Sequence, residues 1–95
     1  MISHRDHRRA LQREMRRRGI DATLIISRPA THWLTGFRGT ASHTVVFPRS
    51  AVFFTDFRYI ESAQRDLAGV RVIDHGNRLK ERIASLLRRR GVRLR

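Results

Sequence analysis

The 95-residue chain contains no cysteine. This absence excludes disulfides, a thiolate nucleophile and any metal site that depends on thiolate ligands. The chain also lacks a run of about 18 apolar residues, which a membrane-spanning helix would need. Its first ten residues contain no apolar stretch of the length found in a signal peptide. These absences predict a cytoplasmic protein that does not enter the membrane.

Basic residues greatly outnumber acidic residues, with 21 Lys and Arg against eight Asp and Glu, and the net charge is +13. The excess lies near the two ends of the chain. Charge of this kind supports weak, salt-sensitive binding of nucleic acid without sequence preference. A dedicated nucleic-acid-binding protein would also present a groove-entering helix or exposed stacking aromatics. A free-standing basic α/β module that binds nucleic acid or an acidic protein partner is therefore the alternative function.

Both ends of the chain predict helices that stop at a run of arginines followed by glycine. Ser3 and Asp6 predict the N-terminal cap of the first helix, and residues 16–19 predict its end. Asn77 is the predicted cap of the last helix, and residues 88–91 predict its end. The inner face of that last helix is expected to consist of Leu79, Ile83, Leu86 and Leu87.

Four segments between these helices predict strands. They are expected at residues 21–27, 43–47, 51–55 and 70–73. The first has the continuous apolar character of a strand buried on both faces. The three residues between the second and third predict a hairpin, whereas the other connections contain helical segments and predict crossovers. We therefore expect a mixed sheet of four or five strands with helices packed against it, the fifth strand beginning within residues 92–95.

The stretch VFFTDFRYIESA places Asp56, Arg58 and Tyr59 where a strand gives way to a helix. Asp56 is the predicted helix cap. The buried face of this helix is expected to consist of Phe57, Ile60, Ala63 and Leu67. Ligands commonly bind at the ends of strands in α/β sheets, so this corner is a candidate site. The alternative is purely structural, with a capping Asp, an Arg that reaches a carbonyl or carboxylate, and a Tyr at the sheet edge.

The segment after a short predicted helix at residues 29–36 is the second candidate. Its two glycines allow sharp turns or a close approach to another surface. Its Trp, Phe and Arg side chains are residue types enriched at binding sites. The candidate residues are Trp33, Gly36, Phe37, Arg38, Gly39 and Thr40. The alternative is a connection whose aromatic rings cover the sheet, and no phosphate-binding glycine motif is present.

The five histidines do not predict a metal or catalytic site. His4 and His7 are three residues apart on the first helix, but they lack a nearby carboxylate and fall on the stripe expected to face the core. Two further histidines follow residues of the types found in a catalytic triad, at Ser42–His43 and Asp74–His75. Adjacent residues on a strand point to opposite faces, which argues against a Ser-His-Asp hydrolase.

Three stretches, in this order, resemble the N-terminal domain of the creatinase, prolidase and aminopeptidase P family, the pita-bread metallopeptidases. They are LQREMRRRGIDATLIISRPATHWLTGFRGT, AVFFTDFRYIESAQRD and LKERIASLLRRRGV. The resemblance implies a single three-layer α/β domain with a mixed sheet of about five strands, helices on both faces and a ribonuclease H-like topology. The chain departs from the family pattern at Ser42 and His43, near which a second glycine is often found, and at Phe57, where Gly is usual.

The resemblance also implies a relationship to peptidases that act on bonds next to proline. In that family two divalent ions, commonly manganese, are held by a C-terminal domain through two Asp, one His and two Glu. We expect residues 1–95 to be an N-terminal domain that ends where its last strand begins, without the catalytic domain, a cofactor or catalytic residues of its own.

The function implied for such a domain is oligomer assembly and covering of the active site of a neighbouring subunit. Its implied partners are the C-terminal peptidase domain and sister subunits. The segment from Trp33 to Thr40 would contact substrate or a sister subunit. Asp56, Arg58 and Tyr59 would lock the corner that holds this segment in position.

Overall fold

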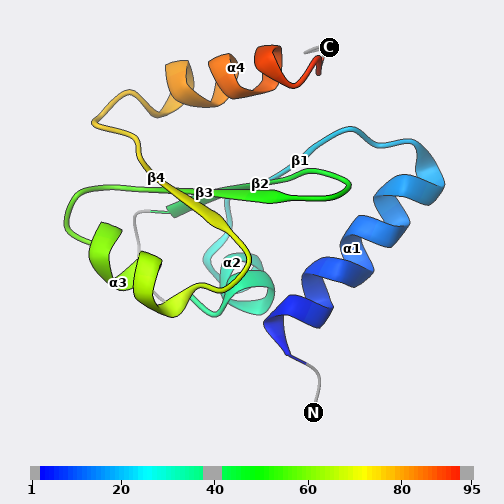
Figure 1. Ribbon diagram of the computed structural model, residues 1–95, viewed down its shortest axis with the longest axis horizontal. Helices are drawn as coiled ribbons and strands as arrows, with labels where there is room; N and C mark the ends of the chain where they lie inside the picture. The colour runs from blue at the N-terminus through cyan, green and yellow to red at the C-terminus, as the bar shows by residue number, and fades with distance from the viewer. Residues whose placement is uncertain (1–2, 38–41, 93–95) are drawn as a thin grey trace.

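The computed structural model describes residues 3–37 and 42–92. Helices separate the described strands along the chain, except at the second and third strands, which follow each other directly, as Figure 1 shows. In order, the described elements are α1 (His4–Arg18), β1 (Thr23–Ile25), α2 (Arg28–Thr35), β2 (Ser42–Val46), β3 (Ala51–Thr55), α3 (Ile60–Asp66), β4 (Arg71–Asp74) and α4 (Leu79–Arg89). None of the helices in the described ranges is long and apolar enough to cross a bilayer.

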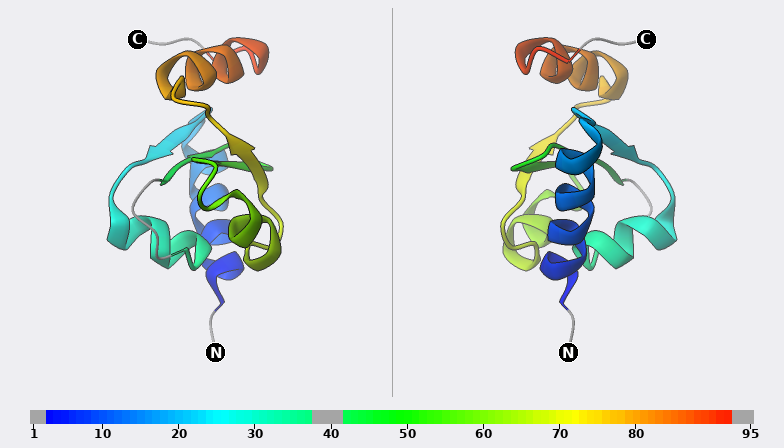
Figure 2. Two further views of the ribbon diagram at one scale, coloured as in Figure 1. Left: turned by 90° about the vertical axis from the view of Figure 1, so that its left-hand side faces the viewer. Right: turned by 90° about the vertical axis from the view of Figure 1, so that its right-hand side faces the viewer.

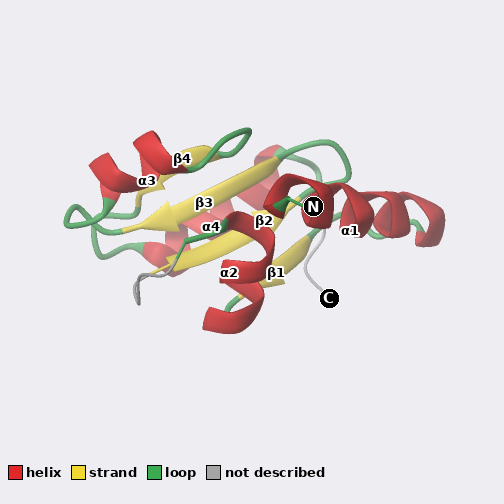
Figure 3. Cartoon of the chain, turned by 90° about the horizontal axis from the view of Figure 1, so that it is seen from below, coloured by secondary structure: helices red, strands yellow, loops and turns green. Residues whose placement is uncertain are grey.

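The four described strands form one mixed sheet in the order β1-β2-β3-β4, seen side by side in Figure 3. β1 and β3 are each antiparallel to β2, whereas β3 and β4 are parallel. The turn between β2 and β3 is closed by a 2.8 Å hydrogen bond from the amide of Phe47 to the carbonyl of Ser50. The predicted hairpin and mixed sheet are confirmed.

Helices cover both faces of the sheet, with α4 on one side and α1, α2 and α3 on the other (Figures 1 and 2). Alternate residues of β3 explain this, since successive side chains on a strand point to opposite faces. Val52 and Phe54 pack in the cluster that contains Leu86 and Leu87 of α4. Phe53 packs with residues of the α3 region. The predicted three-layer α/β fold and the inner face of α4 are both confirmed.

The ends of α1 form as the sequence predicts. The hydroxyl of Ser3 accepts a hydrogen bond from the amide of Asp6, and the Asp6 carboxylate accepts one from the amide of Ser3. This reciprocal pair satisfies amides that the first turn of a helix leaves without partners. Gly19 ends the helix in the left-handed conformation, with a φ of 67°.

The first strand is shorter and more exposed than predicted. β1 pairs only with β2 and lies at one edge of the described sheet. Its side chains are not buried on both faces, since Leu24 is 50% exposed and the following Ile26 is 66% exposed. The prediction of a strand buried on both faces is wrong. Val92 lies outside any strand, and residues 93–95, where the fifth strand was expected to continue, lie outside the described residues.

The predicted caps of α3 and α4 are also wrong. α3 begins at Ile60, after a turn, and no side chain caps it. Phe57 lies in that turn and is 77% exposed, so it does not extend the buried face of the helix. Asn77 adopts a left-handed φ of 63°, whereas an N-cap residue requires an extended backbone. Arg78 occupies the position before α4, without a capping hydrogen bond from its side chain.

Candidate functional site

Three aromatic rings join the end of α2 to the corner between β3 and α3. The ring of Phe37 meets that of Phe53 at a centroid distance of 4.8 Å, and it meets that of Tyr59 at 5.7 Å. Both contacts are edge to face, an arrangement that the charge distribution of aromatic rings favours. Phe53 is fully buried in the central strand. The two candidate regions that the sequence predicts are thus in direct contact through Phe37 and Tyr59.

Asp56 and Arg58 form a clamp beside Tyr59. The Asp56 carboxylate accepts hydrogen bonds from the Arg58 amide at 3.0 Å and from the guanidinium at 2.7 and 3.2 Å. The same guanidinium lies 5.3 Å from the centre of the Tyr59 ring, within the range of a cation–π contact. The backbone carbonyl of Asp56 accepts from the Tyr59 amide at 3.0 Å. The acid therefore closes a turn, and it does so in place of the helix cap that the sequence predicts.

The clamp fixes the charge of both of its members. The guanidinium hydrogen bonds from Arg58 hold the pKa of Asp56 below its ordinary value, and its amide adds to this effect. The Asp56 carboxylate in turn raises the pKa of Arg58. Both groups are ionised near neutral pH. This arrangement suits a structural role, because a general acid or base needs a pKa near the working pH.

Two histidines close to the clamp were not predicted to belong to it. His43 pairs with Phe54 across the β2–β3 ladder, and His75 follows β4 and donates its amide to the carbonyl of Thr55. Burial lowers the pKa of His43, and the charge of His75 lowers it further. The charge of His75 also contributes to the lowered pKa of Asp56. The register of the strands could have revealed this grouping, whereas the order of residues along the chain shows only each histidine's immediate neighbour.

Trp33 lies against α1, at the start of the second candidate segment. Its ring stacks on that of His7 with a centroid distance of 3.9 Å and an angle of 6° between the planes. Its carbonyl oxygen is 3.1 Å from Nδ1 of His4 and 2.7 Å from Nδ1 of His7. Because a carbonyl only accepts, both ring nitrogens carry the proton in these contacts. Trp33 nevertheless remains 52% exposed.

Gly36 ends α2 in a conformation that only glycine adopts easily. Its φ is 84°, and a Cβ at this position would lie 2.9 Å from a ring carbon of His4. The predicted end of the short helix is therefore confirmed. Next to it, a hollow of about 500 Å³ is lined by Arg28, Pro29, His32 and Phe37. Arg38, Gly39 and Thr40, the remaining candidates of this segment, lie outside the described residues.

His4 and His7 do not face the sheet core as predicted, because they contact the end of α2. The inward position on α1 is taken by Arg8, which is only 5% exposed. Its guanidinium donates to the carbonyls of Leu34 at 2.8 Å and Ala68 at 2.6 Å. Nothing in the sequence marks Arg8 as buried, since a single arginine among many on a basic helix forms no distinguishing pattern.

The described residues hold no group of three or more His, Asp or Glu side chains arranged to bind a metal ion. Ser42 and His43 pair with Thr55 and Phe54 in the ladder, so the two side chains point to opposite faces of the sheet, and Ser42 is buried. The Asp74 carboxylate accepts from the amide of Gly76 at 2.9 Å.

Comparison with known proteins connects this arrangement to one family. A model of the creatinase/prolidase N-terminal domain matches residues 7–94. An uncharacterized peptidase of Bacillus subtilis, YqhT, is 37% identical over 75 residues, which are 79% of this chain and 21% of that protein. The chain thus spans about a fifth of the length of this curated relative.

Solved structures show the same fold. An Xaa-Pro aminopeptidase of Streptococcus pyogenes is 29% identical, with a TM-score of 0.84 over 97% of this chain and 71% of the other. The N-terminal domain of the cytoplasmic peptidase PepQ of Mycobacterium tuberculosis is 32% identical, with a TM-score of 0.64 over 70% of this chain and 53% of the other.

Proposed function

The chain belongs to the creatinase/prolidase N-terminal domain family, and from this premise we propose that it is the non-catalytic N-terminal domain of a proline-specific metallopeptidase. Similarity to an Xaa-Pro aminopeptidase of Streptococcus pyogenes supports the substrate class. The chain spans 21% of the Bacillus subtilis peptidase. Catalysis would accordingly take place in a further domain of a longer protein.

The positions of the carboxylates support a non-catalytic role. All eight acidic residues of the sequence lie within the described ranges. Five accept hydrogen bonds in caps, turns or ion pairs, namely Asp6, Glu14, Asp56, Asp66 and Asp74. The others are exposed on separate segments, namely Asp21, Glu61 and Glu81. The two divalent ions expected for the parent enzyme, which we propose to be manganese, do not fit this set and would be held outside the chain.

The proposed role is to assemble subunits and to cover the active site of a neighbouring subunit. One observation carries this role: the contact of Phe37 with Phe53 and Tyr59 anchors the end of α2 on the sheet. The exposed Trp33 and the hollow beside Phe37 then form a firmly held surface that faces outward. Rigid aromatic side chains on such a surface are well suited to contact a partner. The partners would be the C-terminal domain and sister subunits, in the cytoplasm, where the PepQ relative is described to act.

The first test is a peptidase assay of the purified 95-residue chain with Xaa-Pro peptides, with and without added manganese. We expect no hydrolysis, because this reaction requires a metal-activated water and a complete ligand set. Turnover that survives repurification and disappears on substitution of a residue in this chain would contradict the proposal.

The second test compares the full-length peptidase with a version that lacks residues 1–95. We expect the shortened protein to retain its metal ions, to lose its oligomeric state in analytical ultracentrifugation and to cleave longer peptides relatively faster. An unchanged oligomer with unchanged preference for peptide length would remove the proposed role while leaving the family assignment in place.

A further inference from the structure

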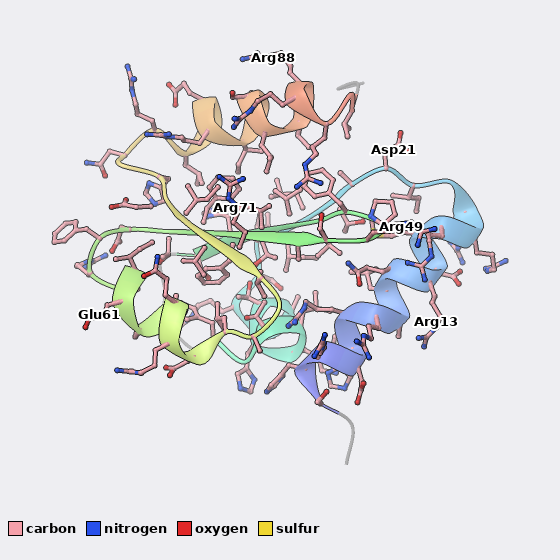
Figure 4. All side chains as sticks on the ribbon, in the orientation of Figure 1. Arg13, Asp21, Arg49, Glu61, Arg71 and Arg88 are labelled. Carbon is pink, nitrogen blue, oxygen red and sulfur yellow. The ribbon has the colours of Figure 1, made fainter. Side chains whose placement is uncertain are left out.

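A row of arginines on α1 faces the turn between β2 and β3. Arg5, Arg9 and Arg13 are spaced four residues apart, which places them on one side of the helix. Arg49, in the turn, lines a hollow together with Arg9 and Arg13, and Figure 4 labels Arg13 and Arg49. We call Arg5, Arg9, Arg13 and Arg49 the arginine row.

No member of the arginine row forms an ion pair within the described part of the chain. Ion pairs in that part occupy other arginines, namely Arg17, Arg18, Arg58 and Arg65. The charge of Arg9 contributes to the lowered pKa of Asp6, after the larger effect of the hydrogen bonds to Ser3. Like charges four residues apart on a helix repel each other. The row therefore creates a positive field, and the charges of Arg5 and Arg9 help to lower the pKa of the buried Arg8, after the larger effect of its burial.

The arginine row lines two neighbouring hollows between α1 and the turn. One has a volume of about 300 Å³ and is lined by Arg9, Gln12, Arg13, Arg16, Pro48 and Arg49. The other has a volume of about 190 Å³ and is lined by Arg5, Arg8, Arg9, Gln12, Arg49, Ser50, Ala51 and Gly69. No carboxylate lines either hollow. Pockets for drug-sized organic ligands usually measure about 300–1,000 Å³, so these hollows suit a compact ligand.

The walls of these hollows are fixed by hydrogen bonds that do not involve the arginine row. Gln12 donates to the carbonyls of Phe47 at 3.0 Å and Ser50 at 3.1 Å. Arg16 donates to the carbonyl of Pro48. These bonds tie α1 to the turn, so the backbone on both sides of the two hollows is held in place. Binding to such a prepared site costs less ordering entropy.

We propose that the arginine row is a binding site for a compact polyanion that contains two or more linked phosphate groups. Guanidinium groups bind phosphate oxygens through paired, charge-assisted hydrogen bonds. Several uncompensated guanidinium groups favour a ligand with several negative charges over a single carboxylate. This activity is separate from the proposed peptidase role, because the row lies on α1 and the turn, away from Phe37 and Tyr59.

The same features favour a linked phosphate over a nucleic acid strand. No aromatic side chain lines either hollow, so nucleic acid bases would find no ring on which to stack. The small volumes match a phosphate group more closely than a base. The phosphate groups could come from inorganic pyrophosphate or polyphosphate, or from a nucleotide, and the experiment separates these sources.

The test is isothermal titration calorimetry of the 95-residue chain with pyrophosphate, tripolyphosphate, ATP, a single-stranded oligonucleotide and an acidic peptide, in phosphate-free buffer. One variant carries Arg5→Gln, Arg9→Gln and Arg13→Gln. The matched control carries Arg82→Gln, Arg88→Gln and Arg89→Gln on α4, which lies on the opposite face of the sheet. Both variants lose the same formal charge, so they separate a local site from the effect of net charge. Thermal melts establish that each variant is folded.

We expect pyrophosphate or tripolyphosphate to bind the wild-type chain. The affinity of the α1 variant should be lower by a factor of about ten or more, as loss of charge-assisted hydrogen bonds predicts. The α4 variant should bind nearly as well as the wild type. Equal binding of ATP and tripolyphosphate would identify the phosphate chain as the ligand, whereas tighter binding of ATP would identify a nucleotide source. Equal weakening in the two variants would overturn the proposal, as would binding of only the oligonucleotide or the acidic peptide.

Discussion

The rings of Phe37 and Tyr59 meet edge to face, with centroids 5.7 Å apart and planes at 88°. This contact joins the end of α2 to the turn before α3. The ring of Phe53, on β3, packs against the ring of Phe37. The guanidinium of Arg58 lies over the ring of Tyr59. The corner and the segment that the sequence marks separately therefore form one physical unit. Changes in the turn should therefore alter the packing of the Phe37 ring.

Replacement of Asp56 should destabilise the domain by opening the turn. Asp56→Ala removes the acceptor for the amide and the guanidinium of Arg58. Asp56→Asn keeps an oxygen for the amide but loses the charge, so its melting temperature should lie between those of Asp56→Ala and the wild type. Thermal melts near neutral pH check this order. If Asp56→Ala melts like the wild type, the clamp does not hold the turn.

The same clamp predicts a pH dependence at the acid end. The folded pKa of Asp56 is lowered from an ordinary value of 3.8. The stabilisation is therefore complete above this ordinary value and is lost as the pH falls through the folded pKa. Asp56→Asn should lose less stability than the wild type in this range. Asp6, Glu14 and Asp66 also have lowered pKa values, so part of the acid sensitivity should remain in the variant.

His43 predicts a second pH effect, at a higher pH. Its folded pKa is lowered from 6.5, first by burial and then by the charge of His75. Below this ordinary value the unfolded chain binds a proton that the folded chain does not, so the free energy of unfolding should decrease as the pH falls from 6.5 toward the folded pKa. His43→Gln should reduce this decrease. NMR titration should also show that His75→Gln raises the pKa of His43, and an unchanged value would mean that the two rings do not interact.

The sequence predicts best where a few neighbouring residues decide the structure. Ser3 and Asp6 can satisfy the first amides of α1 whatever the rest of the chain does, and Gly19 and Gly36 supply left-handed backbone at helix ends. The hairpin before β3 is equally local. The mixed sheet and its two covered faces follow from the order of these elements, so the fold class was accessible without the structure.

The sequence predicts less well where a side chain has competing partners or where its partner is distant. Asp56 is of a residue type that commonly caps helices, but Arg58 binds its carboxylate and a turn forms in place of the first helical residues. Arg8 is buried because the carbonyls of Leu34 and Ala68 lie where its guanidinium can reach them. The exposure of β1 depends on its position at the edge of the described sheet. The burial of Arg8 and the exposure of β1 cannot be read from residues close in the sequence.

Gly36 and Gly19 allow a test of the close packing between α1 and α2. Both have positive φ, so substitution by Ala should cost each about 1–2 kcal/mol. An added Cβ at Gly19 meets nothing within 4 Å, whereas at Gly36 it would lie 2.9 Å from the ring of His4. Gly36→Ala should therefore cost more than Gly19→Ala in chemical denaturation. Adding His4→Ala should remove the difference, measured against His4→Ala alone, and a difference that persists would place the strain elsewhere.

Arg8 should contribute to stability although it carries a charge. Arg8→Met would leave the carbonyls of Leu34 and Ala68 without their donors, which we expect to cost about 2–4 kcal/mol of unfolding free energy. The matched control is Arg13→Met on the exposed side of the same helix, which should change it by no more than about 0.5 kcal/mol. Urea denaturation of both variants gives the comparison. Equal effects would show that the loss of charge, and not the buried hydrogen bonds, determines stability.

Substitutions at Trp33 and Phe37 test whether the outward surface has a structural role only or also contacts substrate or a neighbouring subunit. Trp33→Ala removes the stacking on His7 and should cost about 0.5–1.5 kcal/mol of stability. Phe37→Ala should cost about 1–3 kcal/mol, because the half-buried ring packs on Phe53 and Tyr59. In the full-length peptidase, both should lower KM for longer peptides relative to KM for dipeptides, because the cover is loosened, and should leave kcat nearly unchanged, since neither residue belongs to a metal site. Ile26→Ser, at the other end of α2 and 66% exposed, is the control. If the Trp33 and Phe37 variants lower stability but leave KM equal to that of the control, these rings only cover the sheet and the proposed contact with a neighbouring active site is wrong.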